Sequence, residues 1–154
     1  MDPIKLVANM SIETFSEMMA VSRRQVREIL FSQLGVKAKS KSLLKNLKQK
    51  KEDRIAALHE SLKHSSSKRE ADVCTELVRN WLYSKRPLLK SALDHLGVPN
   101  DNGLIDSEPT LFAELSKDQV SSLYKHLCKD FEKEHVAIYL EFMNTANLDA
   151  VLAA

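Results

Sequence analysis

Apolar residues in this chain recur at steps of three and four positions, a spacing that places them on one face of an α-helix. Such stripes begin near the N-terminus and continue almost to the C-terminus. Sustained alternation of apolar and polar residues, which marks half-buried strands, is absent, and the 154 residues include only three glycines. The sequence therefore predicts an all-α protein folded as a helical bundle with short connections.

Two consecutive helices are predicted between residues 11 and 34. Ser22 stands before an apolar run and has Gln25 three residues later, the spacing of a capping box, so we expect the second helix to begin at Ser22. Ser11 is expected to cap the first helix, and only residues 20–22 then separate the two. The positions expected to face inward are Ile12, Phe15, Met18, Met19, Val26, Ile29, Leu30 and Leu34.

This segment resembles the helix-turn-helix motif of bacterial transcription regulators. That motif reads small residue, three residues, glycine, apolar residue, serine or threonine, and then apolar positions on the second helix. The corresponding residues here are Ser16, Ala20, Val21, Ser22, Val26 and Ile29. The resemblance covers residues 11–31, and alanine stands at position 20 where glycine is usual.

The resemblance implies a recognition helix. In that family the second helix lies in the major groove of duplex DNA, and side chains near its N-terminus reach the base edges. The residues to which the resemblance gives this role are Ser22, Arg23, Arg24, Gln25 and Arg27. The alternative interpretation of the same residues is a pair of core helices joined by a tight turn.

Charge is divided unequally along the chain. Residues 1–70 carry 15 Lys and Arg against 8 Asp and Glu, whereas residues 71–154 carry 8 against 13. Seven lysines and no acid lie between residues 37 and 51, and such a run attracts phosphate through counterion release. The lysines added to the candidate nucleic-acid contacts are Lys37, Lys39, Lys41, Lys45 and Lys48. The other interpretation of this run is a solvated helix face.

The change in charge coincides with a polar, serine-rich run, so we predict a linker at residues 64–70. Residues 1–63 would then form a basic N-terminal helical region that contains the helix-turn-helix-like segment. Residues 71–154 would form an acidic C-terminal helical bundle, with Trp81 in its core. No family is recognised for the sequence outside residues 11–31.

Catalytic, metal and membrane signals are missing from the sequence. The five histidines lack the spacing of a metal-binding helix, and no glycine-rich phosphate loop or nucleophile elbow is present. No apolar run approaches the roughly 20 residues of a membrane span. Cys74 and Cys128 lack a metal-site spacing and are expected to be reduced. We therefore expect a cytoplasmic protein that is not an enzyme and has no cofactor or metal.

Two functions remain for such a chain. In the first, the basic N-terminal half binds duplex DNA, and the acidic C-terminal half binds a protein partner or self-associates. In the second, the whole chain is a helical adaptor or oligomerisation protein, and its N-terminal helices recognise another protein.

Overall fold

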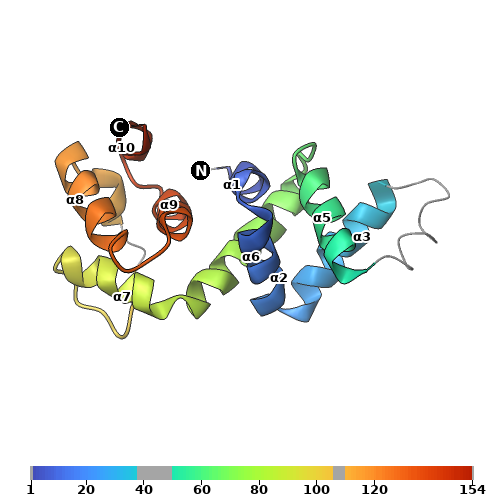
Figure 1. Cartoon of the computed structure of the whole chain (residues 1–154), viewed down its shortest axis with the longest axis horizontal. Coiled ribbons are helices and arrows are strands. Elements are labelled where there is room, and N and C mark those ends of the chain that lie inside the picture. The colour runs from blue at the N-terminus through green and yellow to red at the C-terminus, as the bar shows by residue number, and fades with distance from the viewer. Residues whose placement is uncertain (1, 38–49, 106–109, 154) are drawn as a thin grey trace. The chain divides into compact units, whose positions relative to one another are not determined.

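The computed structural model describes residues 2–37, 50–105 and 110–153. These residues form nine α-helices and one 3-10 helix, and within the same ranges there is no strand (Figure 1). The predicted all-α class is therefore confirmed. The chain divides into two compact units, Asp2–Trp81 and Leu82–Ala154, which are described separately.

Within its described residues, 2–37 and 50–81, the first unit contains four complete helices and most of a fifth. They are α1 (Pro3–Asn9), α2 (Ile12–Val21), α3 (Arg24–Lys37), α5 (Lys51–Leu62) and the greater part of α6 (Lys68–Ser84). Helix α5 packs against α1, α2 and α3, and Figure 1 shows it between α2 and α3. It is therefore the central support of this unit.

Local sequence signals explain where the first helices begin. Asp2 accepts hydrogen bonds from the backbone N–H groups of Ile4 and Lys5 at 3.1 and 3.3 Å, and a proline occupies the first position of α1. Ser11 accepts from the N–H of Thr14 at 3.2 Å, so the predicted cap of α2 is present. Each cap satisfies backbone donors that have no partner inside the helix.

A buried histidine joins three helices of the first unit. Nε2 of His59, on α5, lies 2.9 Å from the carbonyl oxygen of Val7 near the C-terminal end of α1. The His59 ring also stacks on Phe15 of α2, with 4.7 Å between the ring centroids. The Val7 carbonyl lies in the last turn of its helix, where carbonyls lack partners within the helix, so His59 satisfies an otherwise open acceptor.

Trp81 lies in the first unit, which corrects its predicted place in the C-terminal bundle. Its side chain is fully buried, and its indole N–H donates to Oε2 of Glu17 on α2 at 3.0 Å. The apolar stripe correctly predicted a buried face on α6. It did not identify the partner, because a stripe shows which side of a helix is covered but not by what.

The predicted linker at 64–70 also differs from the structure. Helix α6 already begins at Lys68, and the division between the units falls between Trp81 and Leu82, inside that helix. Ser67 and Glu70 explain the early start. The Ser67 hydroxyl accepts from the N–H of Glu70 at 3.2 Å, and the Glu70 carboxylate accepts from the N–H of Ser67 at 3.4 Å. This reciprocal capping box starts the helix within the serine-rich run.

The second unit is built around α8. Its elements are α7 (Arg86–His95), the 3-10 helix η1 (Thr110–Glu114), α8 (Lys117–Leu127), α9 (Lys133–Phe142) and α10 (Leu148–Leu152). Helix α8 packs against α7, α9 and α10. Phe112 meets Tyr139 edge-on with 5.8 Å between ring centroids, and both are buried. Ser116 and Gln119 form a reciprocal capping box at the start of α8.

The loop after α7 contains an Asn-Gly turn. Asn102 and Gly103 both have positive φ, at 49° and 83°, and the N–H of Gly103 donates to Oδ1 of Asn100 at 2.9 Å. A Cβ atom at Gly103 would lie 2.8 Å from the backbone nitrogen of Lys90. Glycine is required at position 103 for both its backbone conformation and its close approach to α7.

Candidate nucleic-acid interface

The connection between α2 and α3 consists of Ser22 and Arg23. The N–H of Ser22 donates to the carbonyl of Met18, which closes the last turn of α2. Among the described residues, left-handed backbone occurs at Gly97, Asn102, Gly103, Asn144 and Asn147, all outside this connection. Alanine at position 20 is therefore free of strain, and this turn does not need the glycine that is usual in the motif.

Ser22 differs most from its predicted role. Its side chain is only 4% exposed, and its hydroxyl donates to the carbonyl of Met19 at 2.9 Å. The hydroxyl is thus directed back toward α2, and α3 begins at Arg24 rather than at Ser22. The predicted DNA contact of Ser22 is therefore wrong, because its side chain is buried and its hydroxyl is directed away from solvent.

Three polar side chains are exposed where α3 begins. They belong to Arg23, Arg24 and Gln25. Nε of Arg24 lies 2.6 Å from Oε1 of Glu28, one turn further along the helix, and the two side chains are 84% and 59% exposed. An ion pair as exposed as this contributes little free energy, so Arg24 can exchange Glu28 for another acceptor at low cost.

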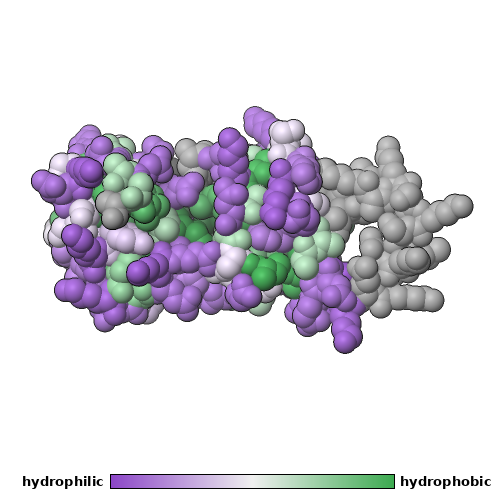
Figure 2. Space-filling model, turned by 45° about the horizontal axis from the view of Figure 1, so that its top comes forward, coloured by the Kyte–Doolittle hydropathy of each residue, from purple (hydrophilic) through white to green (hydrophobic). Residues whose placement is uncertain are grey.

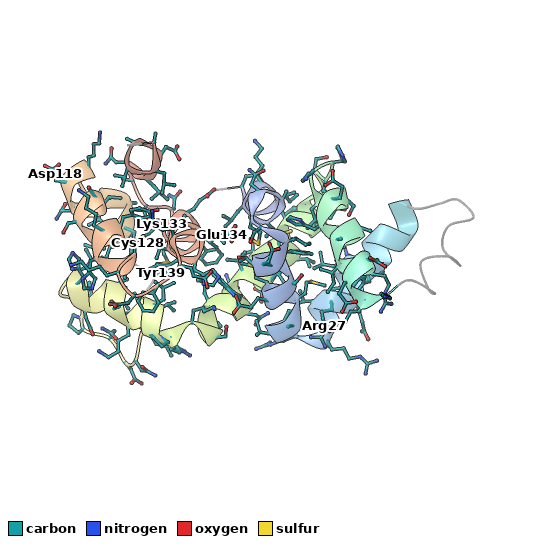
Figure 3. The ribbon with its side chains drawn as sticks, in the orientation of Figure 1. Arg27, Asp118, Cys128, Lys133, Glu134 and Tyr139 are labelled. Atoms are coloured by element: carbon teal, nitrogen blue, oxygen red, sulfur yellow. The ribbon has the colours of Figure 1, made fainter. Side chains whose placement is uncertain are left out.

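Arg27 stabilises the connection between α2 and α3. Its guanidinium donates to the backbone carbonyl of Ser22, and the side chain is half-buried (Figure 3). The carbonyl belongs to the residue that caps the C-terminus of α2, where acceptors outnumber their helical partners. Arg27 therefore ties α3 to the end of α2, while Arg23, Arg24 and Gln25 remain open to solvent.

Apolar and aromatic contacts fix α3 in the first unit. Val26 and Leu30 are buried, as predicted, and α3 packs on α5. The guanidinium of Arg54, on α5, lies over the ring of Phe31 at 5.7 Å from its centroid. The contact of Arg54 was not predicted, because nothing in its helical position indicates which ring it covers. The ion pair of Glu28 was not predicted either, although a spacing of four residues from Arg24 is typical of ion pairs on a helix.

The predicted lysine contacts cannot be placed. Lys37 ends α3, but its side chain lies outside the described residues. The remaining predicted contacts, Lys39, Lys41, Lys45 and Lys48, belong to 38–49, which also lie outside them. Lys50 and Lys51, at the start of α5, are exposed.

The rest of the described chain offers no competing metal site. Within these residues there is no group of three or more His, Cys, Asp or Glu side chains able to hold a metal ion. Cys74 is buried, and burial raises the pKa of its thiol to about 12, so the nucleophilic thiolate is suppressed. No described helix is both long and apolar enough to cross a membrane.

Comparison with known proteins adds no assignment. The chain matches no protein-family model, no curated protein and no solved structure. Its functional interpretation therefore depends on the residues of α2, α3 and α5 described above.

Proposed function

We propose that this protein binds duplex DNA through the N-terminal end of α3. The observation that carries the proposal is the joint exposure of Arg23, Arg24 and Gln25 where a supported helix begins, two residues after the end of α2. These side chain types suit the major groove. Arginine donates two hydrogen bonds to guanine, and glutamine pairs with the edge of adenine.

The electrostatics of the same end of α3 favour an anionic partner. The first backbone N–H groups of a helix carry partial positive charge, and phosphate oxygens bind readily to such a terminus. The basic run starts at Lys37, the last residue of α3, so the most cationic stretch of the sequence follows the opposite, C-terminal end of the same helix. In this proposal the arginines and Gln25 contact bases, while the lysines supply phosphate contacts and affinity.

The roles of Arg24 and Arg27 differ in this proposal. Arg24 leaves Glu28 and bonds a base edge, whereas Arg27 stays on the Ser22 carbonyl and fixes the direction of α3. Replacing Arg27 therefore weakens binding to all DNA sequences alike. Replacing Arg24 weakens binding most at preferred sequences, because it removes a contact that distinguishes one base pair from another.

The test compares Arg24→Ala with a matched control, Arg79→Ala. Both arginines are exposed and ion-paired with a glutamate on their own helix, and both lie in the first unit. Duplexes enriched from a random pool by the wild-type protein are titrated alongside random DNA and followed by fluorescence anisotropy. We expect Arg24→Ala to lose about 5- to 150-fold in affinity for the enriched duplexes, and Arg79→Ala to lose little. Equal losses for the two variants would overturn the assignment of α3 as the recognition helix.

A second candidate function is recognition of another protein by the same helices. The observation that favours it is the exposure of Ile12 and Val21, at the two ends of α2, which are 37% and 44% exposed. Figure 2 shows apolar patches among predominantly hydrophilic residues on the face that it presents. Exposed apolar side chains near a surface that binds no DNA would support the adaptor function.

A further inference from the structure

The second unit contains two stacked histidines where α7 packs against α8. The rings of His95, the last residue of α7, and His126, near the end of α8, lie 4.4 Å apart between centroids at an interplanar angle of 21°. Neither histidine belongs to the proposed DNA-binding surface. An imidazole changes its charge on taking up a proton, so this pair is a titratable contact at the edge of a helix–helix interface, where His95 is exposed and His126 is half-buried.

Serine residues from the opposite helix hold both rings. Nε2 of His126 lies 3.1 Å from the hydroxyl of Ser91 on α7, and Nε2 of His95 lies 3.3 Å from the hydroxyl of Ser122 on α8. The serine and histidine of each helix are four residues apart, so the two Ser–His pairs are one helical turn apart on antiparallel helices. The arrangement is reciprocal, and each helix contributes one serine and one histidine.

Protons reach the pair from solvent. A surface pocket of about 520 Å³ is lined by Pro87, Lys90, Ser91, Asp94, His95 and His126. The charged groups near the rings are Lys129, which lowers the pKa of His95, and Lys90 and Asp94, which line the pocket and are ion-paired with each other. The Asp94 carboxylate also accepts a hydrogen bond from the amide of Asn100 at 2.9 Å, so its charge is already shared.

Protonation changes this contact in two ways. A neutral imidazole nitrogen can accept a hydrogen bond from a serine hydroxyl, whereas a protonated ring has only donors. Two imidazolium rings stacked at 4.4 Å also repel each other. Partial desolvation of its ring, His126 and Lys129 all lower the pKa of His95, so its neutral form is favoured in the folded unit.

We propose that His95 and His126 form a proton-sensitive latch that holds α7 to α8 at neutral pH and loosens this helix pair as the medium becomes acidic. Metal binding is a poorer use of the same pair. The two rings are nearly parallel, so their nitrogen lone pairs point along nearly parallel directions and do not converge on one ion at bonding distance.

The direct test follows the imidazole signals of the full chain by NMR between neutral and acidic pH. His64, which is exposed on the connection before α6, serves as the internal reference. We expect the midpoint of His95 to lie below the ordinary value for histidine, because desolvation of the ring and the neighbouring His126 and Lys129 disfavour its charged form. The substitution His126→Gln removes a titratable neighbour that disfavours protonation of His95, so it is expected to raise the His95 midpoint.

Thermal unfolding tests the consequence for stability. Between neutral and acidic pH, the melting temperature of the wild-type protein is expected to fall further than that of the variant with both His95→Gln and His126→Gln. The control His64→Gln is expected to behave as the wild type does. An unchanged His95 midpoint in His126→Gln would overturn the proposal. If that variant does not fold, the wild-type protein still tests the proposal. The proposal would be overturned equally if His95 and His126 titrated independently of each other and with the same midpoint as His64.

Discussion

Trp81 gives the sharpest test of how the first unit is held together. Its fully buried indole donates to Glu17, and a Trp→Ala substitution at such a position leaves a large cavity. Cavities of this kind destabilise a protein by about 3–5 kcal/mol. Small domains have total stabilities of about 5–15 kcal/mol, so Trp81→Ala is expected to unfold much of this unit and abolish DNA binding with it.

Glu17→Ala separates the hydrogen bond from the packing. This variant keeps the indole in place but leaves its N–H without the carboxylate at 3.0 Å. An unsatisfied buried donor costs about 1–3 kcal/mol, so the loss should be clearly smaller than that of Trp81→Ala. Glu17→Gln, which retains a side-chain oxygen acceptor, is expected to lose less than Glu17→Ala.

The assay uses the chain's single tryptophan as the reporter. Because Trp81 belongs to the first unit, its fluorescence during urea unfolding reports on that unit for the wild-type and Glu17 variants. Circular dichroism follows Trp81→Ala. The native emission maximum should be blue-shifted, as expected for a buried indole. A water-like emission maximum together with an unchanged unfolding midpoint in Trp81→Ala would refute the placement of Trp81 in the core.

Three further predictions concern other parts of the chain. Glu28→Gln removes the negative charge that is paired with Arg24, the proposed DNA contact, so affinity for duplex DNA should rise in an anisotropy titration, most strongly at low salt. Unchanged affinity would place Glu28 away from the DNA. Gly103→Ala should destabilise the second unit by about 1–2 kcal/mol or more in thermal unfolding, and by more than Gly97→Ala, because both glycines have positive φ but only Gly103 faces backbone within 3 Å. The pKa of His95 is lowered by desolvation of its ring and by the nearby His126 and Lys129. Its contribution to stability is therefore complete above the unfolded pKa of about 6.5, and it declines as the pH falls from that value toward the folded pKa. A melting temperature that is insensitive to acid in this range contradicts that sign.

Periodicity and capping signals predicted the local structure well. The helical class and the buried faces of α2, α3 and α6 followed from apolar spacing, and the Ser11 cap of α2 followed from residue type. Each of these features is decided within a few residues of sequence. Ile12 and Ile29 are exceptions among the positions expected to face inward, because Ile12 is 37% exposed at the first position of α2 and Ile29 is only half-buried.

Features that depend on tertiary partners were not predictable in the same way. The pattern around Trp81 could not show that Glu17, 64 residues away in sequence, receives its N–H. Ser22 has the residue type and spacing of a cap, but its hydroxyl bonds the end of the preceding helix instead. Three arginines look alike in sequence, yet Arg27 is occupied by a backbone carbonyl. These choices are set by geometry between helices, which a single sequence does not encode at any fixed spacing.

The measurement that tests the proposed function most directly is a titration of the wild-type protein with mixed-sequence duplex DNA at several salt concentrations. If the exposed residues of α3 and the adjoining lysines contact phosphates, the association constant should fall steeply between about 50 and 200 mM salt, with a slope of roughly −0.9 for each phosphate contact on a double-logarithmic plot. Absence of binding at the lowest salt, or binding that does not change with salt, would contradict DNA recognition by this protein.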